Sequence, residues 1–306
     1  MNSPRVGVIG VGAMGMGVAK ALLAKGFEVV VRDLVPAREA EAAAAGARRA
    51  ATPREVAAQV DVLVTLVVDA AQTCDVLDTK TGTDHDFPPG RKPWSVPGLV
   101  VMMCSTIAPA DAEAIAASLA QRGIEMLDAP ISGGPARARA GTLSMMASGS
   151  AAAFDRCAPV IEATTAKCFR VSARCGDGSR MKVVNNMLAA ANLAAGCEAM
   201  ALASKLGLDL RQAVDVVNAS SGQSWIFADR MERALEGDYT PQAAARVLLK
   251  DVGLFVDVAC GLGLDPSMAR AAQDVFRDTV ERGYAEEDDA AVLKRYGDLW
   301  KVAVPR

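Results

Sequence analysis

The feature that most constrains the fold of this chain is a glycine-rich motif placed directly between a strand pattern and a helix pattern. Residues 5–9 form a short apolar run that is typical of a buried parallel strand. The motif Gly10-Val-Gly12-Ala-Met-Gly15 follows at once, and residues 16–24 continue as a predicted helix. These glycines permit a tight turn and let backbone N–H groups at the helix N-terminus approach a pyrophosphate, although a turn without a ligand would also use them. The motif predicts a dinucleotide-binding fold, in which the cofactor would contact Gly10, Val11, Gly12, Ala13, Met14 and Gly15.

An acidic residue follows the next predicted strand. Residues 28–32 are followed by Asp33, which lies 23 residues after Gly10. An acid here can accept hydrogen bonds from both ribose hydroxyls of NAD and would repel the 2′-phosphate of NADP. Asp33 could instead be only a turn residue, and the adjacent Arg32 could favour NADP. Because neighbouring side chains of a strand point in opposite directions, we expect Arg32 to point away from Asp33 and NAD to be preferred.

Strand and helix patterns continue to alternate as far as residue 171. Thr52 and Pro53 are the expected N-cap and first residue of a short helix. Helices are predicted at 36–45, 53–59, 70–77, 110–121 and 151–162, and strands at 62–68, 99–103, 125–128, 143–147 and 167–171. This succession predicts an α/β fold with a Rossmann-type doubly wound parallel sheet, whose ligands lie at the carboxyl ends of the strands. The stretch Thr79 to Pro97 is expected to be a surface loop in which His85 is solvated.

A second pair of glycines precedes the longest apolar run of the chain. Gly176 and Gly178 suit a loop where the backbone turns sharply or lies close to a ligand. Ser179 is the expected N-cap, and residues 181–206 predict a buried helix of six or seven turns. No strand pattern follows this helix. We therefore expect a dinucleotide-binding domain at 1–174, a linking helix at 175–207 and an all-helical (all-α) domain at 208–306 that serves the substrate and oligomerisation.

Two polar side chains project together from this apolar helix. Lys182 and Asn186 are four residues apart, so they share one helix face. They could be a snorkelling lysine and a satisfied core amide, or a catalytic pair that faces a cleft. A lysine acts as a general base near neutral pH only where burial or a neighbouring cation lowers its pKa. Lys250, in a later apolar segment, could be that cation, or it could simply pair with Asp251.

A serine and two glycines follow the strand predicted at 125–128. Ser132, Gly133 and Gly134 would offer a hydroxyl and exposed backbone N–H groups to a carboxylate or hydroxyl oxygen. A turn without a ligand would use the same residues. The sequence therefore marks a second candidate binding loop.

Composition excludes several kinds of function. The net charge of the 306 residues is −3, and neither a basic patch nor an aromatic-rich stretch argues for nucleic acid. No uninterrupted apolar run is long enough to span a membrane. We therefore expect a cytoplasmic protein that makes no membrane contact. The seven cysteines lack a CxxC pair and indicate reduced thiols. His85 is the single histidine, so we expect no metal site and no Ser-His-Asp triad.

Four motifs in order give the chain a resemblance to a known family. They are residues 8–15, Asp128 to Gly134, the pattern of Gly178, Lys182, Asn185 and Asn186, and Lys250-Asp251. Together they resemble the β-hydroxyacid dehydrogenase family, which includes 3-hydroxyisobutyrate dehydrogenase and tartronate semialdehyde reductase. Residues 222–227, 237–241 and 287–292 look most like the L-threonate dehydrogenase branch.

The resemblance implies an enzyme that oxidises a small hydroxy or sugar acid with NAD. It implies Lys182 as general acid/base and Asn186 as the amide that orients the substrate. It also implies Ser132, Gly133 and Gly134 at the substrate carboxylate, Thr106 and Lys250 near nicotinamide and substrate, and a homodimer or homotetramer. The usual Leu-Pro of the family is replaced by Leu66, Val67 and Val68, which remain candidates for cofactor binding.

Several alternatives remain open from the sequence. Within the family, the reaction could be that of a tartronate semialdehyde reductase or a 3-hydroxyisobutyrate dehydrogenase. An imine reductase of similar two-domain build ranks below these, because that class generally lacks lysine at the position of Lys182. A dinucleotide-binding regulator without catalysis is the alternative outside enzymes. The combination of Lys182, Asn186 and Lys250 favours an enzyme over a regulator.

Overall fold

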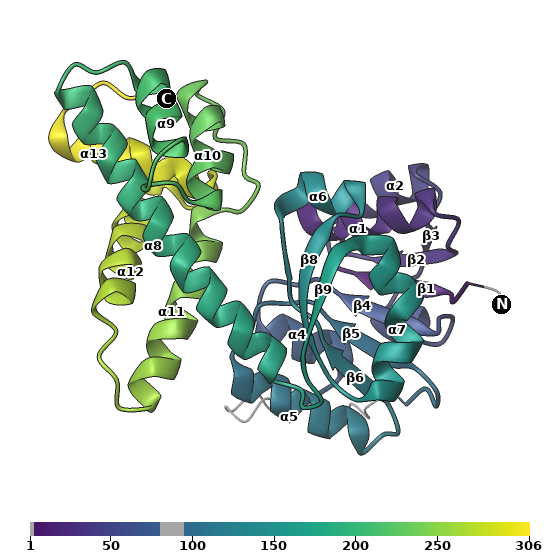
Figure 1. The fold of residues 1–306 in the computed structure, drawn as a ribbon. Helices are drawn as coiled ribbons and strands as arrows, with labels where there is room; N and C mark the ends of the chain where they lie inside the picture. The colour runs from purple at the N-terminus through teal and green to yellow at the C-terminus, as the bar shows by residue number, and fades with distance from the viewer. Residues whose placement is uncertain (1–2, 80–94) are drawn as a thin grey trace. The chain divides into compact units, whose positions relative to one another are not determined.

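The computed structural model describes residues 3–79 and 95–306 (Figure 1). The chain divides into two compact units, Met1–Lys182 and Val183–Arg306, which are described separately. His85 and most of the stretch Thr79 to Pro97 lie outside the described residues, so their predicted place in a surface loop stays a prediction.

Among the described residues, the first unit is built on one mixed sheet of nine strands. The strands are β1 Val6–Ile9, β2 Val29–Arg32, β3 Arg48–Arg49, β4 Val62–Thr65, β5 Val100–Met103, β6 Glu125–Asp128, β7 Ile131–Ser132, β8 Leu143–Ser148 and β9 Thr165–Ser172. Their order is β3-β2-β1-β4-β5-β6-β8-β7, with β9 paired to β8. The pairs from β3 to β6 are parallel, whereas β8 runs antiparallel to both β6 and β7. The predicted Rossmann-type α/β fold is confirmed, with an antiparallel extension beyond β6.

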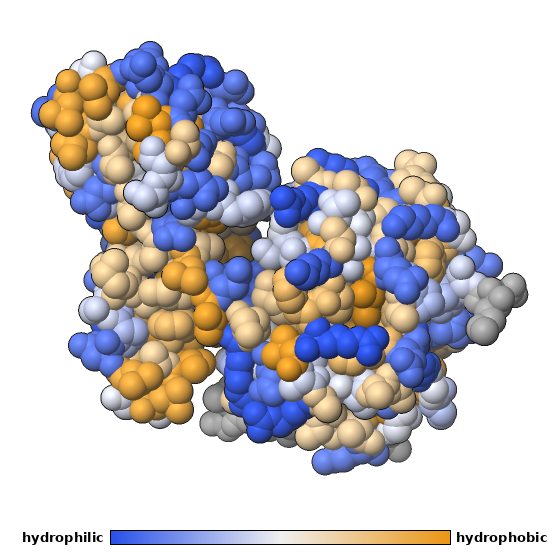
Figure 2. Space-filling model, in the orientation of Figure 1, coloured by the Kyte–Doolittle hydropathy of each residue, from blue (hydrophilic) through white to orange (hydrophobic). Residues whose placement is uncertain are grey.

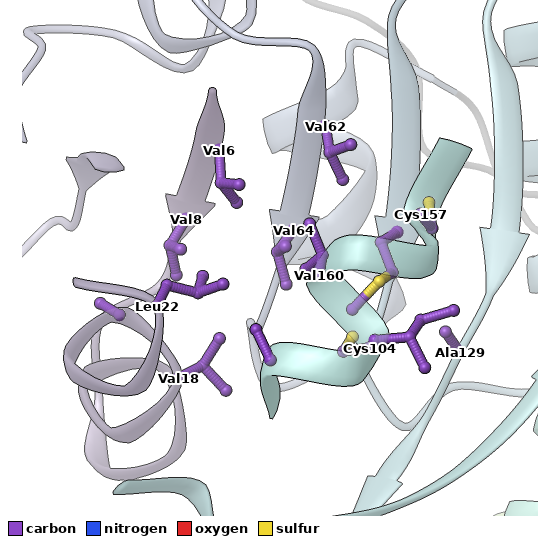
Figure 3. Close-up of a cluster of buried hydrophobic side chains, with 14 of the residues drawn as sticks. Val6, Val8, Val18, Leu22, Val62, Val64, Cys104, Ala129, Cys157 and Val160 are labelled. Carbon is purple, nitrogen blue, oxygen red and sulfur yellow. The ribbon is translucent and has the colours of Figure 1, made fainter. Parts of the chain in front are cut away.

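Helices cover both faces of this sheet. They are α1 Ala13–Ala24, α2 Pro36–Ala44, α3 Pro53–Ala57, α4 Ala70–Leu77, α5 Pro109–Ala120, α6 Gly134–Ala140 and α7 Ala151–Thr164. On one face, Val18 and Leu22 of α1 and Val160 of α7 pack with β-branched residues of β1 and β4 (Figure 3). On the other face, α3, α4 and α5 pack against residues such as Leu63 and Val101. These two clusters explain why the central strands are apolar on both faces.

Several predicted boundaries in the first unit differ from the structure. β4 ends at Thr65, so Val68 is not part of the strand. Two short strands and one short helix, β3, β7 and α6, lie where the sequence predicts none. β3 and β7 have only two residues each, which is too short for an apolar or alternating pattern. The predicted cap of α3 is confirmed, because the Thr52 side chain accepts a hydrogen bond from the Glu55 N–H.

The second unit is helical, as predicted. Its helices are α8 Asp177–Lys205, which begins in the first unit, α9 Leu210–Asn218, α10 Trp225–Leu235, α11 Ala245–Gly261, α12 Ser267–Thr279 and α13 Val292–Trp300. A π-helical turn at Val280–Tyr284 and a 3-10 turn at Asp289–Ala291 join α12 to α13. The core includes Phe227, Phe276 and Val252, which are buried in one cluster with residues of α8 such as Leu193 and Cys197.

Helix α8 differs from the sequence prediction at its start and on its surface. It begins at Asp177, so Ser179 is not its N-cap but lies inside its first turn. The helix is also not apolar and buried all round, since Val184, Leu188 and Leu202 are each about half exposed in the single chain. Among the described residues, α8 alone is long and apolar enough to cross a membrane. A core helix of this composition passes the same test, so the finding is weak evidence for a membrane span.

Candidate active site

Two of the three glycines in the glycine-rich loop are required by the packing of the first unit itself. Gly10 has a φ of +87°, and a Cβ there would lie 2.5 Å from the carbonyl oxygen of Leu66. A Cβ on Gly15 would lie 1.8 Å from the carbonyl oxygen of Gly10. A side chain at either position would therefore disrupt the turn between β1 and α1.

Gly12 lies in open space, and this fits a ligand. The nearest atom that a Cβ on Gly12 would meet is Nη1 of Arg38, at 3.7 Å. Gly12 is also the N-cap of α1, and no side chain caps this helix end. The first N–H groups of α1 can therefore donate hydrogen bonds to the oxygens of a pyrophosphate, which must approach the backbone closely at this glycine. The loop fits the dinucleotide cofactor that its sequence predicts.

Asp33 is a buried acid that follows β2, and backbone N–H groups bind its carboxylate. Its Oδ2 accepts a hydrogen bond from the Val11 N–H at 2.8 Å, and its Oδ1 accepts one from the Val35 N–H at 2.9 Å. Arg32 extends elsewhere: its Nη1 donates to the Asp33 carbonyl and lies 2.7 Å from Oε1 of Glu39. The Asp33 carboxylate also pairs with a cation, Arg38, whose Nη1 lies 3.8 Å from Oδ1. The carboxylate is thereby fixed directly beside the glycine-rich loop.

The remaining predicted cofactor residues follow two neighbouring strands. Leu66, Val67 and Val68 come after β4, and the Leu66 N–H donates to the Ile9 carbonyl at 2.8 Å. Thr106 comes shortly after β5 and is partly buried. Because β1, β2, β4 and β5 are adjacent and parallel, all these segments emerge at one edge of the sheet.

Lys182 is buried and lies against the second predicted binding loop. Its side chain is 8% exposed, and Nζ donates to the carbonyl oxygen of Ile131 at 2.8 Å. Ile131 immediately precedes Ser132, at the end of β7. Gly133 and Gly134 follow with φ values of +132° and +74°, which L side chains rarely adopt. The structure thus brings the lysine together with the Ser132–Gly134 loop.

Asp128 anchors the start of the helix that carries Lys182. Its buried carboxylate accepts hydrogen bonds from the Gly176 and Ser179 N–H groups, each at 2.9 Å, and from the Ser179 hydroxyl at 2.8 Å. The Ser148 hydroxyl donates to it as well, at 3.3 Å. Burial raises the pKa of Asp128, while these donors favour the ionised form. Asp128 therefore fixes the first turn of α8 on β6 and β8.

The glycine before Ser179 serves this same anchor. A Cβ on Gly178 would lie 2.6 Å from the carbonyl oxygens of Asp128 and Met146. Gly178 is therefore required by the close contact of α8 with β6 and β8, and not by a ligand. Gly176, at φ +98°, supplies the sharp turn that the sequence predicts.

Asn186 and Lys250 are joined by a shared acid in the second unit. Nδ2 of Asn186 donates to Oδ2 of the buried Asp251 at 2.7 Å, and Nζ of Lys250 lies 2.7 Å from Oδ1 of the same carboxylate. Lys250 thus pairs with its neighbour Asp251, which is one of the two roles that the sequence allows for this lysine. Its charge is largely balanced by that pairing, so it is a poor candidate for the cation that would depress a lysine pKa.

Apart from the pair of Lys250 with Asp251, the partners of three residues at these sites could not be predicted from the sequence. Asp128, Asp251 and Arg38 have partners that lie far along the chain or on another element. The only signals in the sequence are that Asp128 ends an apolar strand and that Asp251 interrupts an apolar helix. Such signals indicate that an acid is buried, but they do not identify its hydrogen-bond partner.

Comparison with known proteins covers nearly the whole chain. Residues 5–172 match the NAD binding domain of 6-phosphogluconate dehydrogenase, and residues 176–296 match the NAD-binding domain of NADP-dependent 3-hydroxyisobutyrate dehydrogenase. L-Threonate dehydrogenase of Escherichia coli (strain K12) is 42% identical over 298 residues, which are 96% of this chain and 95% of the relative. NAD-dependent L-serine dehydrogenase of Pseudomonas aeruginosa is 34% identical over 299 residues, covering 95% of this chain and 97% of the relative.

A solved structure agrees in fold as well as in sequence. The crystal structure of a 3-hydroxyisobutyrate dehydrogenase from Salmonella typhimurium superposes with a TM-score of 0.85 at 42% identity, covering 96% of this chain and 100% of that one. These relatives are dehydrogenases that act on CH–OH groups, which argues against a regulator without catalysis. The chain therefore belongs to the β-hydroxyacid dehydrogenase family and is an NAD-dependent dehydrogenase of hydroxy acids.

Proposed function

We propose that this dehydrogenase oxidises L-threonate, or a sugar acid of closely similar structure, with NAD as the oxidant. The observation that carries the substrate is the 42% identity to the Escherichia coli enzyme named L-threonate dehydrogenase, which spans both chains. The buried Lys182 beside the Ser132–Gly134 loop supports the chemistry, because a proton acceptor and a cradle for oxygen are neighbours there.

The reaction removes a hydride from the carbinol carbon and a proton from its hydroxyl oxygen. Bound NAD would supply the hydride acceptor. We propose that the Lys182 amine accepts the hydroxyl proton during oxidation and donates it back during reduction. The Ile131 carbonyl accepts one N–H of this amine and so holds the side chain in place. The Ser132 hydroxyl and the backbone of Gly133 and Gly134 would bind the substrate carboxylate, which fixes the substrate before reaction.

Asn186 is proposed to orient the reacting hydroxyl. It lies one helical turn from Lys182 on the same face of α8, so both side chains project in one direction. Asp251 holds the amide nitrogen at 2.7 Å, and Nδ2 of Asn185 donates to the amide oxygen at 3.1 Å. Because both its nitrogen and its oxygen are hydrogen-bonded, the Asn186 amide is held in one orientation. Lys250, on the other oxygen of Asp251, is proposed as a further substrate contact.

The cofactor is proposed to lie along the carboxyl edge of the parallel strands. The N–H groups of Ala13 and Met14, at the start of α1 after Gly12, would hold the pyrophosphate, and Asp33 would accept the adenosine ribose hydroxyls. The segment Leu66 to Val68 and Thr106 would border the cofactor farther along the same edge.

A second candidate substrate is 3-hydroxyisobutyrate. The Salmonella typhimurium structure bears that enzyme's name at the same 42% identity. Tartronate semialdehyde, reduced in the reverse direction, is a third member of the same chemical class.

A substrate panel tests the proposed function. NADH formation is measured with threonate, erythronate, glycerate and 3-hydroxyisobutyrate, and NADH consumption with tartronate semialdehyde. We expect kcat/KM to be highest for L-threonate, by at least about tenfold, since one mismatched group in a fitted pocket costs about 1–3 kcal/mol. Preference for 3-hydroxyisobutyrate would establish the second candidate instead. No turnover with any hydroxy acid would refute the function.

The structure of the Asp33 site predicts a preference between the two cofactors. A carboxylate at about 4 Å from a 2′-phosphate costs on the order of 1–4 kcal/mol through like-charge repulsion. We therefore expect kcat/KM with NAD to exceed that with NADP by at least about tenfold. Asp33→Ser should reduce this preference, mainly by weakening NAD and admitting NADP. Equal use of both cofactors by the wild type would show that the assignment of Asp33 is wrong.

We further propose that the chain forms a homodimer or homotetramer through its helical unit. Exposed apolar side chains recur along one side of α8, at Val184, Leu188 and Leu202, and Leu206 follows just after the end of the helix. Figure 2 shows apolar surface over α8 and at the turn between α11 and α12, where Leu262 is 72% exposed. Apolar surface of this extent on a soluble enzyme indicates a protein interface.

We place the assembled enzyme in the cytoplasm, where its cofactor is found.

Sedimentation measures this association. At micromolar concentration we expect species of at least twice the 31.8 kDa of one chain. Leu188→Glu should shift the population toward the monomer, because it would bury an unpaired charge in the interface. Lys205→Glu, near the exposed end of the same helix, is the control for a change of charge alone. A wild type that sediments only as a 31.8 kDa species would count against the proposal.

A further inference from the structure

One buried acid, Glu39 of α2, holds two arginines next to the predicted ribose site. Its Oε1 lies 2.7 Å from Nη1 of Arg32, and its Oε2 lies 2.8 Å from Nη2 of Arg49. Oε1 also accepts the backbone N–H of Asp33 at 3.1 Å. Burial opposes the charge of Glu39, yet the hydrogen bonds from Asp33, Arg32 and Arg49 hold its pKa at about 2. The carboxylate is therefore ionised at neutral pH and fully engaged.

The two arginines come from adjacent strands that end beside Asp33. Arg32 is the last residue of β2, and Arg49 is the last residue of β3, which pairs with β2. Together with Glu39, Ala50 and Ala51 they line an open cavity of about 290 Å³. The Arg49 side chain is 51% exposed, whereas that of Glu39 is 7% exposed. Guanidinium groups thus line this cavity over a buried acid, and that acid is hydrogen-bonded to the backbone N–H of Asp33, the residue proposed to hold the adenosine ribose.

This arrangement bears on the difference between NAD and NADP. The two cofactors differ by a phosphate on the 2′ oxygen of that ribose, and an arginine close to the acid is the usual means of accommodating it. Arginine binds phosphate through two parallel N–H groups. Arg32 and Arg49 have the required chemistry, but one guanidinium nitrogen of each is already bound to Glu39.

We propose that Glu39 is a specificity-determining residue for the cofactor: it withholds Arg32 and Arg49 from a 2′-phosphate and so enforces the use of NAD. This inference rests on the proposed place of the cofactor at Asp33. A phosphate that entered the cavity would have to displace the ion pairs of the buried Glu39 and would then lie near its carboxylate. With Glu39 neutral, the same arginines would present uncompensated positive charge to the phosphate.

Arg38 is assigned a different role, which the experiment separates. Its Nη1 lies 3.8 Å from Oδ1 of Asp33 and within 3.7 Å of a Cβ built on Gly12, so it borders the glycine-rich loop. A cation there would act on the pyrophosphate, which both cofactors share. Arg38→Gln should therefore weaken NADH and NADPH to a similar degree.

The test compares the binding of NADH and NADPH to the purified full chain by nucleotide fluorescence. Glu39→Gln keeps the size of the side chain and removes its charge, and we expect NADPH to bind about tenfold tighter while NADH changes by less than about threefold. Glu41→Gln is the matched control, because Glu41 lies on the same helix and pairs with Lys20 on the surface. It should leave the ratio of the two affinities unchanged. Adding Arg32→Gln and Arg49→Gln to Glu39→Gln should abolish the gain for NADPH.

A second variant tests the inference even if Glu39→Gln fails to fold. Arg49→Met removes a half-exposed side chain and leaves Arg32 paired with Glu39. If Arg49 is withheld as proposed, NADPH affinity should change by less than about threefold. A loss of about tenfold for NADPH alone would show that Arg49 already serves the phosphate, and would overturn the inference. An unchanged affinity ratio in folded Glu39→Gln would do the same. Failure of the wild type to bind either nucleotide would refute the proposed function as well.

Discussion

Replacement of Lys182 by alanine is expected to lower turnover by about 10²–10⁴-fold, which is the usual contribution of a positioned acid/base group. Lys182 is buried and its amine lies 2.8 Å from the Ile131 carbonyl, next to the loop assigned to the substrate carboxylate. Removal of the amine leaves the hydroxyl proton without an acceptor. The glycine-rich loop and Asp33 are untouched, so NADH should bind with wild-type affinity.

Turnover and NADH binding must be measured on the same preparation to interpret this variant. Lys205→Ala removes a lysine from the last turn of the same helix, where the side chain is exposed, and should have normal activity. Lys182→Arg keeps the charge but not the ability to release a proton near neutral pH, so it should be nearly as inactive as Lys182→Ala. Near-normal turnover in folded Lys182→Ala would show that Lys182 is not the general acid/base.

Replacement of Asp128 by alanine is expected to destabilise the first unit by about 3–5 kcal/mol. The carboxylate is fully buried and accepts the N–H groups of Gly176 and Ser179 together with two hydroxyls. Alanine would leave at least two buried backbone donors without a partner, each at a cost of about 1–3 kcal/mol. The loss would also free the first turn of α8 and so displace Lys182.

Urea unfolding gives the stability of this variant and of its controls. Asp128→Asn should cost roughly half as much, because an amide oxygen can still accept the two backbone N–H groups while its nitrogen cannot replace the second oxygen. Asp155→Asn makes the same chemical change at an exposed position of α7 and should lie within about 0.5 kcal/mol of wild type. If Asp128→Ala were equally stable, the carboxylate would not be the anchor of α8.

Long apolar or periodic segments could be predicted from the sequence, and short or charged ones could not. The helix at 70–77 and the strand at 125–128 have the predicted bounds. In each, both the residue pattern of the element and the point where that pattern stops can be recognised in the sequence. The two-residue strands β3 and β7 exist only through their neighbours in the sheet, so local pattern carries no sign of them. Ser179 resembles an N-cap locally, yet its hydroxyl is used by Asp128, 51 residues earlier.

The candidate site shows the same division. The glycine-rich loop, Asp33 and Lys182 could be identified because their chemistry is carried by a local motif. Asp251 could be suspected only as a partner of its neighbour Lys250, because the amide that it orients, Asn186, lies 65 residues away. The link of Glu39 to Arg49 and Arg32 depends on the pairing of β3 with β2, an edge pairing that the sequence does not reveal.

A crystal structure of the enzyme with NAD and L-threonate tests the central assignment most directly. We predict that Nζ of Lys182 lies within about 3.2 Å of the hydroxyl oxygen that is oxidised, which is the reach of a general base. The Asn186 amide should contact the same oxygen, and the substrate carboxylate should lie on Ser132, Gly133 and Gly134. A bound substrate whose reacting hydroxyl is out of hydrogen-bond reach of Lys182, with another side chain in that place, would contradict the account.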